Sequence, residues 1–467
     1  MNPVRQRGRS HALVVLTFAM FGILAACGPS AAPRSAAPTS AAAPSGTGDV
    51  AGTATPQPAS PRASPLGVPT PSPSTAPTSP TQVEIDRLLA AVAADPDDAE
   101  AQRDLGLALL QRVRETADPS LYEPAAAALE TAKRLAPDDA TVLVGIGALQ
   151  LGKHEFANAL ETGRQAAELS PSLASARAVI VDALVELGRY DEADGAAGEM
   201  LALSTDLSTL ARVSYLAELQ GKLDVALSAM RMAAASPGLA PENTAYVQAL
   251  FGNLLVYTGD PAAAAKAYEA ALDEVPAHAP SLAGQGRLAV GQGRLDDAIE
   301  LFRRASEIVP LPEYVIALGD AQAAADLPED ATSSFALARA EIQLFEASGV
   351  VVDLDLALFE ADHGNPARAL TFAEAAYDTA PTVRAADALA WALHGLGRDG
   401  EAKPYVDEAL RLGSRDPLLR YHAGAIESAL GDDASARRDL ELALATDPGF
   451  SATGAVRARR LLAALTD

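Results

Sequence analysis

Cys27 is the only thiol in the 467-residue chain, and it stands directly after an apolar run. Arg5, Arg7 and Arg9 precede that run, and residues 12–26 contain no charged side chain. The run is too short to span a bilayer comfortably, and its basic flank and small-residue end are typical of a secretory signal. A thiol can form a disulfide, bind a metal or accept an acyl group, but a secreted chain without a second cysteine cannot form an internal disulfide.

The four residues from Leu24 to Cys27, LAAC, resemble the lipobox of bacterial lipoproteins. The resemblance implies that residues 1–26 are a signal peptide removed by signal peptidase II, and that the sulfur of Cys27 carries diacylglycerol. Two or three acyl chains hold a protein stably at a membrane, whereas one chain holds it marginally. The alternative is a plain signal peptide, or an uncleaved anchor, with a chance cysteine. The first interpretation places the protein in the bacterial cell envelope, lipid-anchored on the extracytoplasmic side of a membrane.

Histidines supply the other side chains that could do chemistry. Five follow Cys27: His154, His278, His363, His394 and His422. None lies in an HExxH motif, and the chain has no GxSxG motif, no Walker loop and no second cysteine for a zinc site. His394 and His422 could approach each other in adjacent repeats, with Asp387 nearby, so they are either metal ligands or solvated groove histidines. The sequence therefore predicts a binding protein without catalysis, cofactor or metal.

Residues 27–81 join the lipidated cysteine to the rest of the chain. From Gly28 onward they are mostly Pro, Ala, Ser and Thr, as in PTPSPSTAPTSPT. Such a composition cannot bury enough apolar surface to offset the entropy of ordering, so we predict a disordered tether that spaces the folded part from the lipid. Contact with the cell wall or O-glycosylation of its hydroxyls is the alternative role.

Repeats fill the chain from Gln82 onward. The segments GRYDEADGAAGEMLALS, GDPAAAAKAYEAALDEVP and GRLDDAIELFRRASEIVP begin at Gly188, Gly259 and Gly293. Each has a glycine turn and an alanine five residues later, and the period is near 34 residues. This pattern resembles the tetratricopeptide repeat (TPR), a helix-turn-helix unit. The resemblance implies an all-α, right-handed α-solenoid of about ten units over residues 82–450, with a capping helix at 451–467.

Small side chains recur at fixed places in these units. The first key position of the second helix is alanine in all ten: Ala125, Ala159, Ala193, Ala226, Ala264, Ala298, Ala331, Ala369, Ala402 and Ala436. A position midway along the first helix is also small in nine units, with Val181 as the exception. Small residues let the two helices of a unit approach closely, and because no unit buries its apolar face alone, stability comes from stacking.

The concave groove of such a solenoid is lined by the first helices, so their polar and aromatic side chains are candidates for binding. They are Tyr215, Tyr246, Asn253, Tyr257, Arg287, Trp391, His394, Tyr421 and His422. Trp391 follows the small position Ala390, which places it either in the groove or wedged between two units. The resemblance implies a protein–protein interaction scaffold whose partners are other envelope proteins or peptides, in envelope assembly, secretion or pilus machinery. The alternative is an accessory subunit of an envelope enzyme, or a glycan-binding protein, in polysaccharide export or cell-wall synthesis.

Charge excludes one class of partner. The chain has a formal net charge of −25, and loss of the three signal arginines leaves 33 basic and 61 acidic residues, hence −28. Phosphate binding needs a basic face, so we do not expect nucleic acid as a partner. The acidic surface favours basic partners or serves solubility alone.

The lipid anchor can be tested with Cys27→Ala. We expect this variant to lose labelling by radioactive palmitate and to remain unprocessed, because no other thiol can accept the lipid. Gel mobility and detergent partitioning measure both effects. A variant that still runs at the mature size and partitions like wild type contradicts the anchor.

Overall fold

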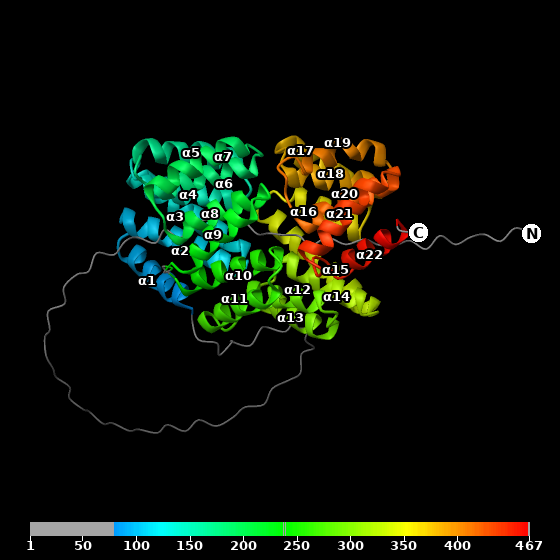
Figure 1. Ribbon diagram of the computed structural model, residues 1–467. Coiled ribbons are helices and arrows are strands. Elements are labelled where there is room, and N and C mark those ends of the chain that lie inside the picture. The colour runs from blue at the N-terminus through cyan, green and yellow to red at the C-terminus, as the bar shows by residue number, and fades with distance from the viewer. Residues whose placement is uncertain (1–78, 237, 239, 466–467) are drawn as a thin grey trace, which may run out of the picture.

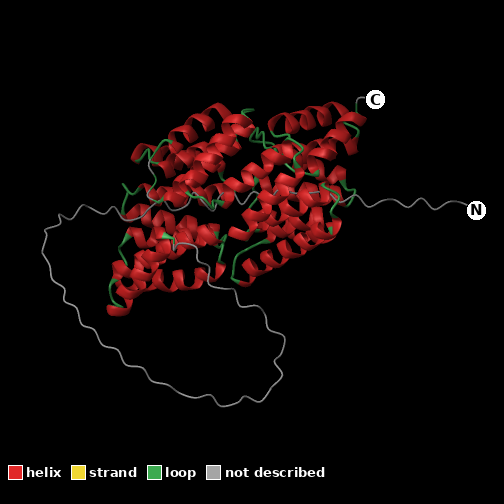
Figure 2. Ribbon diagram, turned by 90° about the horizontal axis from the view of Figure 1, so that it is seen from below, coloured by secondary structure: helices red, strands yellow, loops and turns green. Residues whose placement is uncertain are grey.

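The computed structural model describes residues 79–236, 238 and 240–465, and these residues form helices joined by turns, without strands (Figures 1 and 2). The α-helices are α1 (Pro80–Ala94), α2 (Ala99–Thr116), α3 (Tyr122–Leu135), α4 (Ala140–Gly152), α5 (Phe156–Leu169), α6 (Ala174–Glu186), α7 (Tyr190–Leu203), α8 (Leu207–Leu219), α9 (Leu223–Ala234), α10 (Pro241–Tyr257), α11 (Pro261–Glu274), α12 (Ala279–Gly291), α13 (Leu295–Ile308), α14 (Pro312–Ala324), α15 (Pro328–Ala347), α16 (Asp353–His363), α17 (Pro366–Thr379), α18 (Val383–Gly395), α19 (Asp399–Ala409), α20 (Pro417–Leu430), α21 (Asp433–Thr446) and α22 (Gly454–Ala464). A 3₁₀ turn, Pro119–Leu121, precedes α3.

Cys27, the signal segment and the tether as far as residue 78 lie outside the described residues. The tether was predicted to extend to residue 81, but α1 already begins at Pro80, because the Ser79 side chain caps it and proline is favoured in the first turn of a helix. Within the part of the chain that the structure does describe, no helix combines the length and the apolar character needed to cross a membrane.

Ten helix pairs follow α1. Each even-numbered helix from α2 to α20 is the first helix of a unit, and it packs most extensively on the odd-numbered helix that follows it. The predicted alanine column lies in the contact between the two helices, and nine of its ten members are fully buried, with Ala331 at 3% exposure. The prediction of an all-α solenoid is therefore confirmed, with α1 before the first unit and α22 after the last.

Large side chains of the second helices occupy the space that the small residues midway along the first helices leave free. A Cβ atom added to Gly106 would lie 2.5 Å from Cγ of Leu129, and one added to Gly286 would lie 2.7 Å from Cε1 of Phe302. Real Cβ atoms do not approach carbon so closely, because protein interiors are close-packed. The small position thus sets the distance between the two helices of each unit.

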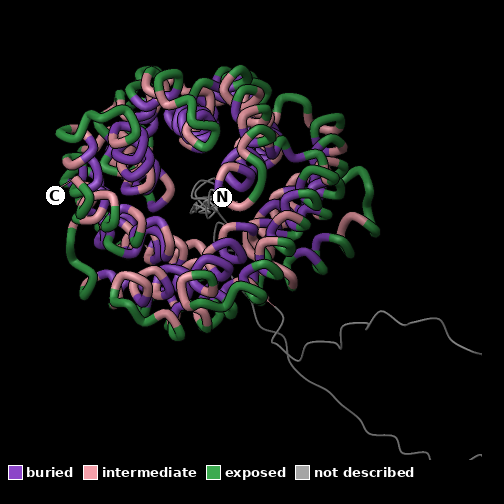
Figure 3. Tube along the Cα trace, turned by 90° about the vertical axis from the view of Figure 1, so that its right-hand side faces the viewer, coloured by how far each residue is buried: buried purple, intermediate pink, exposed green. Residues whose placement is uncertain are grey.

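The solenoid winds back onto itself, so that units far apart in sequence touch. Figure 3 shows the helices arranged around a central axis, and Figure 1 shows α4–α9 beside α16–α21. The turn between α4 and α5 pairs with the chain before α16, where the backbone N–H of Val351 donates to the carbonyl of Lys153 at 3.2 Å. The backbone N–H of Val383 donates to the Tyr190 hydroxyl at 3.1 Å. The turn inside the second unit therefore contacts the chain at the start of the eighth unit. In the same way, the turn inside the third unit contacts the start of the ninth.

Two glycine turns make the closest of these approaches. Gly188 (φ +71°) and Gly221 (φ +68°) lie in the turns inside the third and fourth units. A Cβ atom on Gly188 would lie 2.6 Å from the carbonyl oxygen of Pro381, and one on Gly221 would lie 2.2 Å from that of Gly413. Glycine is required there twice over, because only it adopts a positive φ without strain and only it leaves room for the facing backbone.

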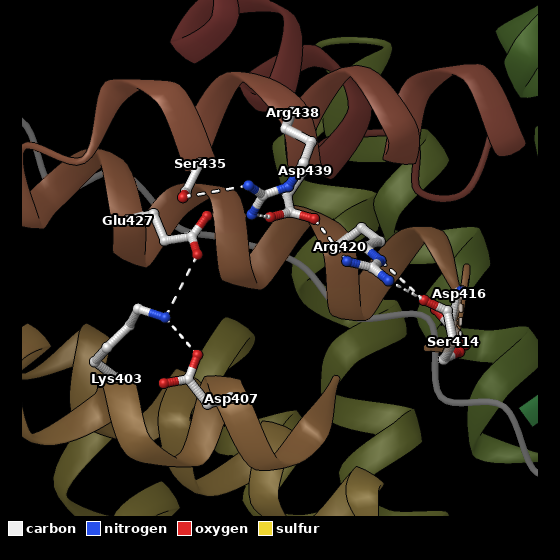
Figure 4. Close-up of polar contacts among 9 residues, drawn as sticks. All are labelled: Lys403, Asp407, Ser414, Asp416, Arg420, Glu427, Ser435, Arg438 and Asp439. Atoms are coloured by element: carbon white, nitrogen blue, oxygen red, sulfur yellow. Dashed lines mark hydrogen bonds and ion pairs between the residues drawn. The ribbon is translucent and has the colours of Figure 1, made fainter. Parts of the chain in front are cut away.

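Charged side chains join the last two units (Figure 4). The buried carboxylate of Asp439 accepts hydrogen bonds from Arg420 and Arg438, both at 2.7 Å. Arg420 also donates from Nε to the carbonyl of Ser414 at 2.8 Å. Lys403 of α19 lies 3.6 Å from Glu427 of α20. Because these groups use one another as partners, we assign the network a structural role at the end of the solenoid.

The contact between superhelical turns can be tested with a matched pair of glycine variants. Gly221→Ala and Gly293→Ala each place alanine at a positive φ, which costs about 1–2 kcal/mol. Nothing lies within 4 Å of a Cβ atom at Gly293, whereas that atom at Gly221 meets backbone. We expect Gly221→Ala to lower the free energy of unfolding by roughly a further 1–3 kcal/mol, since the facing backbone must move. Chemical denaturation measures the difference, and equal losses in the two variants would show that the contact contributes nothing.

Candidate functional site

The first helices enclose an inner cavity on the concave side of the solenoid. It has an empty volume of about 1580 Å³, is open to solvent, and is lined mainly by residues of α2, α8, α10, α12, α14 and α20. These helices come from the first unit, from the fourth to seventh units and from the tenth unit. The winding of the solenoid therefore brings both ends of the repeat array to one site.

Five of the nine predicted groove residues line this inner cavity: Tyr215, Tyr246, Asn253, Tyr257 and Arg287. Asn253 Oδ1 accepts a hydrogen bond from the Tyr268 hydroxyl at 2.7 Å and another from the Arg287 guanidinium. Tyr268 is fully buried and packs against the glycines Gly252 and Gly284 of the two adjacent first helices. Asn253 and Arg287 are thus held in place by the packing of their own units.

The other four predicted groove residues lie elsewhere, which corrects the prediction that they face the groove. Trp391, Tyr421 and His422 are buried at 4%, 2% and 0% exposure, and His394 is half-buried. The Trp391 ring stacks on His422 at 4.0 Å and on His394 at 4.9 Å between ring centres. Its Nε1 donates to the buried carboxylate of Asp362 at 2.8 Å.

The physical reason is that α16, α18 and α20 pack side by side at this place. Trp391 fills the space between them. This is the second of the two predicted alternatives, in which Trp391 is wedged between two units. A large aromatic ring that is both stacked and hydrogen-bonded at its polar edge belongs to the core.

The two histidines that could have formed a metal site have other partners. His422 Nδ1 lies 2.9 Å from Asp387 Oδ2, and His394 Nδ1 is hydrogen-bonded to Asp399. The Trp391 ring stacks on both imidazoles. Among the described residues, no group of three or more His, Cys, Asp or Glu side chains is arranged to hold a metal ion.

Acidic side chains outnumber basic ones in the inner cavity. Five carboxylates line it, from Glu218, Glu242, Glu313, Asp416 and Asp447, against the guanidinium groups of Arg114 and Arg287. Burial raises the pKa of Glu218 to about 7, and Asp416 beside it adds to that shift. Burial also raises the pKa of Asp447 to about 6. Burial therefore disfavours the charged forms of these two carboxyl groups, and a cationic ligand would stabilise them.

Tyrosine hydroxyls provide neutral donors in the same cavity. Burial raises the pKa of Tyr215, Tyr257 and Tyr314 well above the ordinary value for tyrosine. Their hydroxyls therefore stay protonated and can donate hydrogen bonds while their rings offer apolar surface. This combination suits an extended ligand with polar groups along its length.

Several lining residues were missed by the sequence analysis. Glu218 lies three residues after Tyr215, so the two side chains share one face of α8 and the spacing could have indicated it. Arg114, Asp416 and Asp447 come from α2 and from the loops beside α20 and α21. No local signal marks them, because only the winding of the whole solenoid brings them to the inner cavity.

A second, more apolar cavity of about 790 Å³ was not predicted either. It lies between the first two units and the region from α14 to α16, where Leu110, Tyr122 and Phe345 line it. Arg114 borders both this cavity and the inner cavity. The cavity thus lies where successive turns of the superhelix meet.

Comparison with known protein families supports the repeats directly. The family model of the tetratricopeptide repeat matches residues 85–123 and 250–311. These two segments are therefore tetratricopeptide repeats, as the glycine and alanine columns predicted, and the helix pairs outside them carry the same alanine column. Repeats of this family generally serve as scaffolds that bind peptides or proteins. A search of curated proteins found no match to the chain.

Solved structures with tetratricopeptide repeats also resemble parts of the chain. YrrB, described as a TPR protein with an unusual peptide-binding site, is 21% identical, covering 39% of this chain and 92% of its own, with a TM-score of 0.28. Pseudomonas aeruginosa pilF is 19% identical, covering 45% and 98%, with a TM-score of 0.37. The human IFIT1 dimer with PPP-AAAA is 16% identical, covering 71% and 78%, with a TM-score of 0.44. We draw no functional inference from likenesses at these levels.

Proposed function

We propose that this protein is a non-catalytic scaffold that binds a segment of a partner polypeptide in the inner cavity. The observation that carries the proposal is the convergence of Tyr215, Tyr246, Asn253, Tyr257 and Arg287 on one enclosed space. The cavity is open to solvent and is lined by helices from both ends of the repeat array, so a segment of an extended chain can enter it and contact several units. Solenoids use their concave surfaces in this way.

We further propose that the scaffold works at the bacterial cell envelope, in the assembly of envelope, secretion or pilus machinery. This part rests on the sequence alone, through the LAAC segment that ends at Cys27 and the Pro-rich stretch that follows. As a flexible coil that 54-residue stretch would span roughly 40 Å on average. The solenoid could then reach partners near the membrane while its anchor stays in the lipid.

A glycan is the second candidate ligand for the inner cavity. Tyr215, Tyr246, Tyr257 and Tyr314 offer rings on which sugars stack, and Asn243 and Asn253 offer amides. In that case the protein would be an accessory subunit of an envelope enzyme or a glycan-binding protein. The uneven charge of the cavity favours a polypeptide, because neutral sugars make no use of five carboxylates.

Photo-crosslinking inside the cavity distinguishes these candidates. We expect p-benzoylphenylalanine in place of Tyr257 to give a covalent adduct with a polypeptide after irradiation of intact cells. The photoreactive group would lie against the bound segment, and mass spectrometry would identify the attached peptide.

The matched control carries the same photoreactive residue in place of Tyr405. Tyr405 lies on α19, a second helix, and packs edge-on against Tyr377 outside the cavity. Polypeptide adducts that are equally frequent at both positions would contradict binding in the cavity. An adduct with the mass of a sugar at position 257 would favour the glycan.

A further inference from the structure

A side cavity extends from the inner cavity between α12, α14 and the loop after α21. It has an empty volume of about 450 Å³ and shares Arg287, Glu313, Tyr314 and Phe450 with the inner cavity. Asp320 borders the side cavity but not the inner one. The side cavity therefore connects the inner cavity, past two aromatic rings, to a carboxyl group.

Asp320 is unusual among the buried side chains of this region. It is only 1% exposed, and neither of its carboxyl oxygens has a hydrogen-bond partner among the described residues. His363 of α16 lies beside it, with Nε2 3.7 Å from Oδ1, which is beyond hydrogen-bond distance but close enough for an ion pair when the imidazole is protonated. Nearly all buried polar groups in proteins have a partner, because an unpaired one is costly. Asp320 is therefore a buried carboxyl group to which no described residue donates a hydrogen bond.

We propose that Asp320 is a subsite for a basic side chain, lysine or arginine, of the partner polypeptide. This inference rests on the proposed function, since the polypeptide backbone must occupy the inner cavity. A carboxylate accepts hydrogen bonds and pairs with cations, so the missing partner is a donor that carries positive charge. Tyr314 and Phe450 at the junction of the two cavities add aromatic faces, which attract cations.

The electrostatic surroundings favour a cation over other donors. The inner cavity that leads to Asp320 has five carboxylates against two guanidinium groups. Arg287, the one cation that borders both cavities, already donates to Asn253. A neutral donor would pair with Asp320 but would not stabilise the charged forms of these carboxyl groups.

The protonation of Asp320 should change when the cation binds. Burial, followed by the nearby Asp362 of α16, raises its pKa well above the ordinary value, and Arg457 of α22 opposes the shift. His363 of α16, Arg287 of α12, and Glu313 and Tyr314 of α14 complete the surrounding titratable and charged groups. The empty side cavity therefore favours the neutral acid. Binding of a cation lowers this pKa and releases the proton, so affinity should rise as pH rises.

Binding of synthetic peptides to the full chain in detergent tests this subsite. The probe is a fluorescent octalysine peptide at about 0.15 M salt, and its partner is the same peptide with every lysine Nε-acetylated. We expect wild type to bind the lysine peptide more tightly. We expect Asp320→Asn to weaken that binding about tenfold, since a hydrogen bond to a charged group is lost.

The control variant is Glu269→Gln, which removes one negative charge from the exposed face of α11 and should bind as wild type does. Circular dichroism checks folding, and Asp320→Ala replaces Asp320→Asn if the latter does not fold. Between pH 5 and 8 the affinity of wild type should rise more steeply than that of the Asp320 variant. A purely structural role for Asp320 would not produce this difference.

Three outcomes would overturn the subsite. In the first, wild type binds the two peptides equally well. In the second, the Asp320 and Glu269 variants have the same affinity for the lysine peptide. In the third, the affinity of wild type and that of the Asp320 variant change equally with pH. None of them touches the photo-crosslink at position 257, which tests the proposed function separately. Loss of that crosslink with the Asp320 preference intact would instead contradict binding in the inner cavity.

Discussion

The distance between the two helices of each unit is the constraint on which the other features depend. Alanine on the second helix is buried in every unit, and a small residue on the first helix leaves room for a large one on the second, as Gly319 does for Phe335. Ridges and grooves of side chains fix the angle at which helices pack, so a repeated contact gives a repeated rotation between units. The nine rotations between ten units wind the solenoid far enough to bring its later units against its earlier ones.

That winding turns an open concave groove into an enclosed cavity, and enclosure changes the chemistry of the side chains inside. Glu218 and Asp447 would have the ordinary pKa values of carboxyl groups on an open surface, but burial raises these pKa values to about 7 and about 6. Carboxylates in this environment gain more from a bound cation than carboxylates in water, because Coulomb attraction is stronger at low dielectric. The same enclosure leaves Asp320 without a hydrogen-bond partner among the described residues. Architecture and ligand chemistry are therefore linked through the closure of the solenoid.

Local spacing explains what the sequence could predict. The column from Ala125 to Ala436 identified the repeats and the helix pairs, and the position of Tyr215 and Tyr257 on first helices placed them at the concave face. Trp391 could not be assigned in this way, because a shift of about one position on a helix separates the groove from the contact between units. Arg114 and Asp447 were beyond prediction, since their approach depends on rotations accumulated over many units. The predictions for the signal segment, for Cys27 and for the tether as far as residue 78 concern residues that the structure does not describe.

The central claim, that the solenoid closes on itself, is tested most directly by the distance between two loops far apart in the chain. Spin labels attached at Lys222→Cys and Arg415→Cys, in a chain that also carries Cys27→Ala, would report on the turn of Gly221 and the facing linker of Gly413. Both positions are exposed, so the labels should not disturb packing. Double electron–electron resonance should give one narrow distribution at the short end of the measurable range. A broad distribution, or one centred at long distance, would show an open solenoid and contradict the enclosed cavity.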